Sequence, residues 1–357
     1  MLLANKEVQD LIKAMGLQHG KVYATEADFK SLRYGKGIML MADQDYDGFH
    51  IGGLILNLFE HLWPSLVERP GFFRRMQTPI VKVSRGSTVH QFFRLAEFEA
   101  WVDEQPPGWA SAWTTKYYKG LGTSTAKEGK EYFADLGRHL ITFVPSDKAH
   151  AALDMAFHKD RTAERKTWLR ATSLEQLQQQ AGVTDTQTIP AFVDDQLVQF
   201  SLYNNERAIP RMVHGLKPGQ LKVLTRMLQL PGEKDQKVAQ LGPDVAQTMG
   251  YHHGETSLAN TIVTMAQDYV GANNLNLLVP SGQFGTRLQG GKDAASARYI
   301  YTRLHPLARL IFRAEDDPVL HQRMEEGQKI EKGLVPILPL VLINGASGIG
   351  TGWSTCG

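Results

Sequence analysis

Cysteine, long apolar runs and net charge are all scarce in this chain of 357 residues. Its single cysteine, Cys356, excludes a disulfide framework and a zinc site built on cysteines, and it favours a reducing compartment. The longest apolar run, Leu334 to Ile343, contains two prolines and is far shorter than the roughly 20 residues of a membrane helix. The first residues lack the basic and apolar parts of a signal peptide. The sequence therefore predicts a globular protein that neither is secreted nor enters a membrane.

The charges nearly balance, with 39 Lys and Arg against 37 Asp and Glu, so the surface as a whole is not suited to binding a polyanion. The most basic stretch, residues 281–313, holds six basic residues and only one acid, Asp293. Cationic side chains on glycine-rich loops can contact a phosphodiester backbone whatever the net charge of the chain. This stretch is therefore the candidate nucleic-acid interface.

A tyrosine, Tyr299, follows Arg298 within the basic stretch. A phenol titrates near pH ~10, so a nucleophilic tyrosine needs a neighbouring cation to stabilise the phenolate and the transition state. Arg298 can supply that charge. Taken alone, an Arg-Tyr pair is far more often an ordinary core or surface feature, so its role depends on what surrounds it.

The chain length fits about two domains, and the pattern predicts an α/β part followed by a mainly α part. The expected helices cover residues 6–15, 51–62, 151–169 and 255–266, and the expected strands cover 37–42, which reads as buried, 79–83 and 91–95. The tract 176–180 is expected to be exposed, and glycine-rich loops are expected at 282–291 and 345–352. The last residues form a glycine-rich turn with no closing element, which indicates a fragment.

Three carboxylates, Asp43, Asp45 and Asp47, alternate directly after the predicted strand 37–42, where α/β sheets expose their ligand sites. Closely spaced hard oxygen ligands suit Mg²⁺. The same pattern opens a calcium-binding loop, but the twelfth loop position is Leu54 instead of the required Glu, which excludes that site. A solvated acidic turn is the alternative.

Two further segments carry polar groups whose role the local sequence leaves open. Residues 116–124 contain Gly-Leu-Gly between a lysine and hydroxyl side chains, but they lack the ending of a nucleotide-binding phosphate loop. They either approach a backbone phosphate or cap a strand. His252 and His253 are adjacent and poorly spaced for one metal, so they either contact a phosphate near the start of the helix 255–266 or serve the structure.

Together these segments closely resemble the cleavage core of eukaryotic-type (or viral) type IIA DNA topoisomerases, and the resemblance covers nearly the whole chain. Several long motifs in one order are much more specific than any one of them. The residues that carry it are 43–48, 116–124, 215–220, 251–255, 283–287, 290–293 and 348–353.

The resemblance implies a Rossmann-like TOPRIM domain followed by a winged-helix domain and the start of a tower domain. The implied boundaries are 1–145 for the TOPRIM domain, which lacks its N-terminal part, and 146–190 for a helical linker. Residues 191–336 would form the winged-helix domain with the tyrosine, and 337–357 the truncated start of the tower.

The implied activity is ATP-dependent transient cleavage of both DNA strands through a 5′-phosphotyrosyl intermediate, with strand passage and religation. Tyr299 would be the nucleophile and Arg298 would stabilise the transition state. Asp43 and Asp45 would hold Mg²⁺ in a two-metal site, with Asp47 as a nearby or alternate ligand. ATP would bind in a domain that precedes this chain.

The resemblance also implies DNA contacts and partners. Double-stranded DNA would be the substrate, and a homodimer is implied because the tyrosine and the metal site that act together come from different protomers. A nuclear location follows from the family, or a viral or host-cytoplasmic one for a viral source. The backbone contacts would come from His252, His253, Lys237, Gln283, Arg287 and Lys159, and Ile349 would insert between base steps and bend the duplex.

Three departures from the family pattern stand out. The Glu-Gly-Asp-Ser motif, whose Glu is a metal ligand, is absent from this chain, so the metal site is incomplete and the fragment alone is expected to be inactive. Leu221 replaces a usual Arg, and His214 a usual acid. A catalytically silent DNA-binding or dimerising homologue is therefore the alternative. Another TOPRIM enzyme, a primase or nuclease, would lack the tyrosine-bearing segment 282–299.

Overall fold

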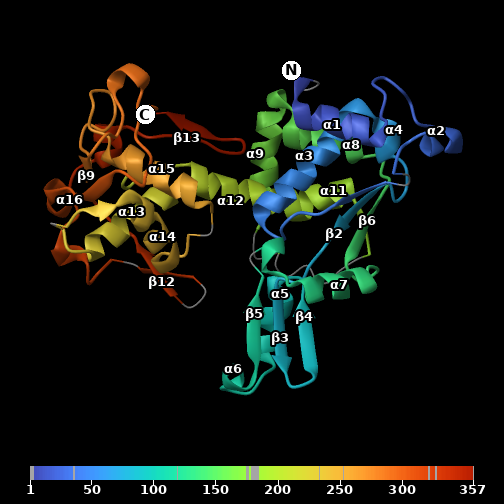
Figure 1. Cartoon of the computed structure of the whole chain (residues 1–357), viewed down its shortest axis with the longest axis horizontal. Helices are drawn as coiled ribbons and strands as arrows, with labels where there is room; N and C mark the ends of the chain where they lie inside the picture. Colours follow the sequence, from blue (N-terminus) through green and yellow to red (C-terminus); the bar gives the residue numbers. More distant parts are fainter. Residues whose placement is uncertain are drawn as a thin grey trace. The chain divides into compact units, whose positions relative to one another are not determined.

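The computed structural model describes residues 4–34, 37–118, 120–173, 177, 185–232, 234–251, 253–320, 322–325 and 328–356. By its internal contacts the chain divides into unit 1, residues 1–203, and unit 2, residues 204–357 (Figure 1). Each unit has its own hydrophobic core.

Unit 1 alternates helices and strands. Its strands are β1 (Ile38–Leu40), β2 (Phe73–Met76), β3 (Val81–Arg85), β4 (Thr88–Phe92), β5 (Thr114–Tyr117), β6 (Leu140–Val144) and β7 (Thr186–Thr188). Its helices are α1 (Lys6–Met15), α2 (Glu26–Lys30), α3 (Tyr46–Leu62), α4 (Pro64–Val67), α5 (Leu95–Asp103), α6 (Trp109–Ala112), α7 (Ala126–Ala134), α8 (Ala149–Phe157), α9 (Thr162–Ala171) and α11 (Ile189–Phe192). Single turns are η2 (Leu121–Thr123) and η3 (Lys159–Arg161), a π-helical turn is η4 (Val193–Leu197), and α12 (Val198–Ala208) leads into unit 2.

The main sheet of unit 1 has the order β1-β2-β6-β7. β1 runs parallel to β2, β6 pairs antiparallel with β2, and β7 runs parallel to β6. Leu56 and Phe59 on α3 pack with Phe73 from β2, Phe143 from β6 and Leu153 from α8 in one core. This burial fixes α3 against the sheet, so the loop between β1 and α3 has a defined position.

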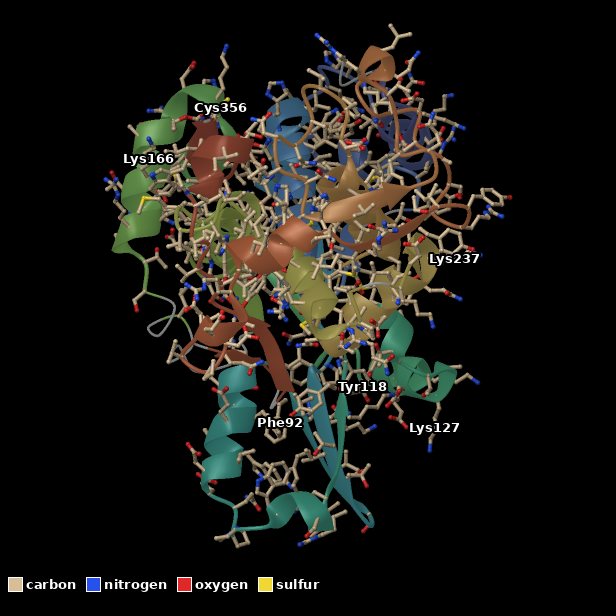
Figure 2. All side chains as sticks on the ribbon, turned by 90° about the vertical axis from the view of Figure 1, so that its left-hand side faces the viewer. Phe92, Tyr118, Lys127, Lys166, Lys237 and Cys356 are labelled. Carbon is tan, nitrogen blue, oxygen red and sulfur yellow. The ribbon has the colours of Figure 1, made fainter. Side chains whose placement is uncertain are left out.

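A second sheet of unit 1 has the order β4-β3-β5 and is antiparallel (Figure 1). Its small core joins Val81, Val83 and Phe92 to Phe98 on α5. Figure 2 labels Phe92 in this sheet and Tyr118, which directly follows β5. The sheet thus ends in the segment 116–124.

Unit 2 is mainly helical. Its helices are α13 (Pro218–Gln229), α14 (Val238–Thr248), α15 (Glu255–Ala266), α16 (Pro306–Ile311) and α17 (Leu340–Asn344), with single turns η5 (Arg287–Gln289) and η6 (Ala314–Asp316). Its strands are β8 (Gln236–Lys237), β9 (Leu278–Ser281), β10 (Tyr301–Leu304), β11 (Gln322–Glu325), β12 (Gln328–Lys332), β13 (Ser347–Ile349) and β14 (Ser354–Cys356). β10 lies between β8 and β9, and α13, α14 and α15 pack over the shared core.

Several predicted elements are confirmed. α1 and α15 have the predicted bounds, and α1 is capped by Asn5, whose side chain accepts a hydrogen bond from the Val8 N–H. α3 ends at Leu62 as expected but begins at Tyr46, because Asp45 caps it. The helical prediction for 151–169 corresponds to α8 and α9, which η3 separates.

Other predictions need correction. The strand predicted as buried over 37–42 is the shorter β1, and its residues are only half-buried. The strands predicted at 79–83 and 91–95 lie at 81–85 and 88–92, and Leu95 begins α5. The loop predicted at 345–352 contains β13, which pairs with β14. Of the predicted exposed tract, 176 and 178–180 lie outside the described residues, whereas Leu177 is buried.

The range predicted as a helical linker, 146–190, also contains β7, which extends the main sheet of unit 1. In the part of the chain that the structure describes, no helix is long and apolar enough to cross a bilayer.

Candidate functional site

The acidic loop, residues 43–48, joins the end of β1 to α3. Asp45 is the N-cap of α3, and its Oδ1 accepts a hydrogen bond from the Gly48 N–H at 2.7 Å. Asp43 and Asp45 are both exposed. As predicted, these carboxylates follow the carboxyl end of a sheet strand, where they are open to solvent.

Gly48 lets the acidic loop close tightly. A Cβ built at this position would lie only 2.0 Å from the carbonyl oxygen of Asp43. Any side chain here would therefore displace the Asp43 backbone. The glycine that ends the acidic motif is required by this close approach and has no ligand role of its own.

The segment 116–124 meets the acidic loop. The Leu121 N–H donates a hydrogen bond to Oδ1 of Asp43 at 2.6 Å, across 78 residues of sequence. A Cβ at Gly120 would lie 3.1 Å from both carboxylate oxygens of Asp43. Two motifs that the sequence showed separately thus form one site in unit 1. Lys119, within the same motif, lies outside the described residues.

Glu128 accepts hydrogen bonds from several residues of and next to the same segment. Thr125 caps α7, and Glu128 accepts hydrogen bonds from the Thr125 N–H at 2.8 Å and from the Lys116 Nζ at 2.8 Å. It also accepts a hydrogen bond from the Tyr118 hydroxyl. We call Lys116, Tyr118, Thr125 and Glu128 the Glu128 clasp. Figure 2 shows Tyr118 beside α7, whose exposed face carries Lys127.

The clasp has a fixed pattern of charge. Burial raises the pKa of Glu128, but hydrogen bonds from Lys116, Thr125 and Tyr118 outweigh that effect and hold the pKa below its ordinary value. Burial and the hydrogen bond to Glu128 raise the pKa of the Tyr118 phenol. At neutral pH Glu128 is therefore an ionised acceptor and Tyr118 a protonated donor.

The acidic loop has carboxylate oxygens that suit a hard cation as ligands. Among the described residues, no group of three or more His, Cys, Asp or Glu is arranged to hold a metal ion. Within that same part of the chain, Asp43 and Asp45 each use one carboxylate oxygen in a hydrogen bond, which leaves the other available. Because Mg²⁺ keeps several waters and needs only one or two carboxylates, these residues fit it.

In unit 2, Tyr299 lies in the turn before β10 and is 69% exposed. Its N–H donates to the Ser296 carbonyl at 2.8 Å, and the next residue, Ile300, is buried in the core. The Arg298 guanidinium carbon lies 5.6 Å from the centre of the Tyr299 ring. The Tyr299 side chain thus lies in solvent next to the Arg298 cation, as the sequence suggested. The buried Ile300 anchors the backbone beside it.

The loop before Tyr299 is closed by its only acid. The Thr286 N–H and hydroxyl donate to the two carboxylate oxygens of Asp293, both at 2.8 Å, and these bonds lower the pKa of Asp293. Gly285 has φ +103°, and a Cβ on it would lie 2.6 Å from the Gly291 Cα. Asp293 is thus used within the loop, while Gln283 and Arg287 remain exposed.

Lys237 lies beside the strand that follows the tyrosine. It is opposite Tyr301 in the pairing of β8 with β10, and its Nζ is 6.0 Å from the Tyr301 ring centre. The next residue, Val238, donates its N–H to the Ile300 carbonyl at 3.1 Å. Figure 2 shows the labelled Lys237 side chain. Val238 and Ile300 are thus hydrogen-bonded to each other, and Lys237 and Tyr299 are the residues that directly precede them.

α13 supports the histidine segment. The buried Lys222 donates from Nζ to the carbonyls of Met249 at 2.6 Å and Gly250 at 3.1 Å. The His253 ring contacts the Tyr251 ring edge-on, at 5.3 Å between centres. His252 lies outside the described residues. The Gly-Leu-Lys-Pro-Gly-Gln motif thus leads into a helix that fixes the position of Met249 and Gly250, just before the histidine segment.

The two departures in this region are both buried. Leu221, on α13, is 2% exposed and part of the unit 2 core. His214 is 3% exposed, and its Nδ1 accepts a hydrogen bond from the Leu216 N–H at 3.0 Å. Burial, followed by the charge of Arg211, lowers the pKa of His214 to about 4. A neutral imidazole thus accepts the backbone bond that a carboxylate could accept.

The two remaining predicted contact residues are both exposed. Lys159 is exposed in η3 of unit 1. Ile349 lies in β13 of unit 2 and is 83% exposed. The structure thus brings the acidic loop together with residues 120–121 in unit 1, and gathers Tyr299, Arg298 and Lys237 in unit 2.

Comparisons with known proteins cover both units. Residues 76–205 match the family model of the C-terminal associated domain of TOPRIM, and residues 207–356 match that of the DNA gyrase/topoisomerase IV A subunit. DNA topoisomerase 2 top-2 of Caenorhabditis elegans is 52% identical over 98% of this chain, and human DNA topoisomerase 2-alpha is 49% identical over 99%. The chain spans about a quarter of each, 24%.

A solved structure agrees with these matches. The topoisomerase II DNA-binding, cleavage and re-ligation domain of Plasmodium falciparum matches with a TM-score of 0.78 and 45% identity. The match covers 99% of this chain and 48% of the Plasmodium falciparum chain. The fold and the paired motifs are those of a type II topoisomerase cleavage core. The chain belongs to the eukaryotic-type DNA topoisomerase 2 family and corresponds to its cleavage-core region.

The sequence analysis missed the Glu128 clasp and the Leu121 N–H. One signal was available, because Thr125 followed three residues later by Glu128 is a helix capping box. The contact of Leu121 with Asp43 had no sequence signal, since a backbone donor carries no residue type.

Proposed function

We propose that this chain is the DNA-cleaving part of a type II DNA topoisomerase, which cuts both strands of a duplex transiently and reseals them. Tyr299 is the nucleophile: its phenolic oxygen loses a proton and attacks a backbone phosphorus. A phosphotyrosyl bond to the 5′ phosphate forms, the bond to the 3′ oxygen breaks, and that oxygen takes up a proton. Religation reverses each step.

The charged groups have separate roles in this proposal. Arg298 stabilises the phenolate and the charge of the transition state. Asp43 and Asp45 hold Mg²⁺, with Asp47 as an alternate ligand, and the metal supplies charge stabilisation to the scissile phosphate and the leaving 3′ oxygen when bound. His252, His253, Lys237, Gln283, Arg287 and Lys159 contact the DNA backbone, and Ile349 bends the duplex.

The observation that carries the proposal is the setting of Tyr299. A tyrosine that is 69% exposed, next to an arginine and inside the most basic stretch of the chain, has no packing role that would explain its position. The one acid of that stretch is hydrogen-bonded within its own loop. Three of its cations, Arg303, Arg309 and Arg313, form ion pairs with acids outside the stretch. We therefore assign the contact with a polyanion to Arg287, Lys292 and Arg298.

The finer organisation follows from the family. We assign 1–145 to a TOPRIM domain, 191–336 to a winged-helix domain and 337–357 to the start of a tower domain. The linker between the first two, 146–190, contains α8, α9 and the strand β7. In the complete protein, ATP drives strand passage, and the active form is a nuclear homodimer whose tyrosine and metal site come from different protomers.

The test is covalent trapping on a nicked duplex in Mg²⁺. The chain replaces the matching region of the full-length Caenorhabditis elegans relative, so that any missing ligand is supplied. We expect a DNA adduct whose peptide map places the link on Tyr299, with a 5′ phosphate attached. Tyr299→Phe abolishes the adduct because it removes the nucleophilic oxygen.

Tyr301→Phe is the matched control, since Tyr301 is 40% exposed and only two residues away. It is expected to form adduct at the unaltered rate. An adduct that persists in Tyr299→Phe, or maps to another residue, would refute the assignment.

A catalytically silent DNA-binding homologue is the second candidate. The observation in its favour is Leu221, which is buried in the core and supplies no charge where the family usually has an Arg. DNA binding without any adduct in the chimaera would establish this second candidate.

A further inference from the structure

We infer that the Gly120–Leu121 backbone, held in place by the Glu128 clasp, orients the carboxylate of Asp43 for metal binding. Leu121 and Glu128 are positioning residues in this inference. It rests on the proposed function, because it concerns the metal-binding role of Asp43.

The first step is the direct contact. The Leu121 N–H to Asp43 Oδ1 bond, at 2.6 Å, is a short bond to a carboxylate, the kind that is stronger than one between neutral groups. A Cβ at Gly120 would press on both carboxylate oxygens at 3.1 Å. The backbone therefore fixes one oxygen of an exposed carboxylate, and the other oxygen has a defined direction.

The second step is the support of that backbone. Lys116 and Tyr118 lie before the Gly120–Leu121 peptide and Thr125 lies after it, and all three donate hydrogen bonds to the single carboxylate of Glu128. Glu128 is buried and Lys82 lies 3.6 Å from it. Residues on both sides of the Gly120–Leu121 peptide are thereby bound to one carboxylate, that of Glu128. This holds the Leu121 N–H at a fixed position.

The third step is the effect on a ligand. An exposed aspartate samples several rotamers, and binding a cation must then freeze them. A hydrogen bond to the second oxygen removes that cost in advance, and losing such a partner typically weakens metal affinity by about 10- to 100-fold. The clasp and the acidic loop therefore form one metal-positioning device.

The sharpest test replaces the N–H of Leu121. Leu121 is the first residue of η2, and Gly120 before it is extended with φ 175° and ψ 170°, a conformation that a residue before proline can adopt. Proline at 121 removes the N–H and puts its Cδ where Oδ1 of Asp43 lies, so the carboxylate loses this position. We expect Leu121→Pro to weaken Mn²⁺ binding by about 10-fold, measured by electron paramagnetic resonance on the chimaera used in the trapping test, in which any missing ligand is supplied. Leu121→Ala, which keeps the N–H, is expected to stay within about twofold.

A second pair tests the steric part. Gly120→Ala pushes on the Asp43 carboxylate and is expected to weaken Mn²⁺ binding, whereas a Cβ at Gly122 meets nothing within 4 Å and Gly122→Ala is expected to leave it unchanged. Thermal unfolding midpoints of all variants report whether the fold is retained, so a loss of affinity can be separated from unfolding.

Asp43→Asn separates this inference from the proposed function. If Asp43→Asn abolishes Mn²⁺ binding but Leu121→Pro binds as well as Leu121→Ala, the positioning role is wrong and the metal site stands. If the unaltered chimaera binds no Mn²⁺, or binds it equally with Asp43→Asn, the metal assignment fails and the inference fails with it. Adduct formation at Tyr299 is measured independently of both.

Discussion

His214 shows how one buried side chain sets a pH dependence. Its imidazole is kept neutral because burial and Arg211 oppose protonation, and the neutral ring accepts the Leu216 N–H. A protonated ring would lose that acceptor and place a charge in a site that is only 3% exposed. The turn before α13 is therefore sensitive to acid.

The sign of the effect follows from the two pKa values. An unfolded chain protonates His214 below its ordinary pKa of ~6.5, whereas the folded chain does so only near about 4. Stability therefore falls as the pH drops from ~6.5 towards about 4, by up to about 3 kcal/mol. His214→Asn keeps an acceptor for the N–H two residues on and does not titrate. We expect urea denaturation to show a smaller loss of stability between pH 7 and 4.5 for this variant.

Parallel stability curves for the two proteins over that pH range would contradict the assignment. A suitable control is His305→Asn, because His305 Nδ1 also accepts a backbone N–H two residues on, from Leu307, but in an exposed setting. It should leave the slope of stability against pH nearly unchanged.

Among the helices and strands, α7 is linked to the acidic loop indirectly, through the segment 116–124. Its first turn carries Glu128, whose carboxylate joins the end of β5 to the start of the helix. A neighbouring face of the helix is exposed and carries Lys127 (Figure 2). The short helix α7 thus helps to fix the position of the acidic loop, although none of its residues belongs to that loop.

Replacing Glu128 tests that link. Glu128→Gln removes a buried charge that accepts from Lys116, Tyr118 and Thr125, so we expect a loss of about 2 kcal/mol in the free energy of unfolding at pH 7. Because the folded pKa of Glu128 is depressed, its stabilisation is present above the unfolded pKa of ~4.3 and is lost as the pH falls further. The difference between variant and unaltered chain should shrink in acid.

Glu131→Gln is the matched control on the same helix. Its side chain is 46% exposed and lies 3.9 Å from Lys82, so we expect a change within about 0.5 kcal/mol. Equal losses for Glu128→Gln and Glu131→Gln would show that the clasp does not stabilise the segment.

Across the molecule as a whole, the charge is nearly balanced, and apart from Lys159 the basic side chains of the proposed DNA interface lie in unit 2. Binding of DNA should then depend on a few local cations. Each cation that neutralises a phosphate releases a counterion, so affinity falls as salt rises.

We expect Arg287→Gln to reduce the slope of log K against log salt concentration by about 0.9, measured by fluorescence anisotropy on a duplex. Arg287 is exposed in the loop that precedes Tyr299. Lys130→Gln, which removes an exposed charge from α7 in unit 1, should leave the slope unchanged. An equal change in both variants would indicate that net charge, rather than a local contact, governs binding.

Local patterns sufficed for much of this protein. Hydrophobic periodicity placed α1, the end of α3 and α15, because such helices form wherever one face can be buried. Motif order identified the family, which the comparisons confirm. Strand bounds were less accurate, since strands depend on partners distant in the sequence, and β7 joins a sheet from within a range predicted as helical linker.

Tertiary structure alone decided how the motifs meet. Leu121 reaches Asp43, Gly48 must lack a side chain, and Asp293 turns into its own loop. Each of these features depends on a close approach of a backbone to another part of the chain, which residue types do not encode. The amino-acid sequence alone established the chemistry of the site, because it states directly where the carboxylates, the arginine and the tyrosine occur. Their geometry came from packing, because it is set by which surfaces are buried together.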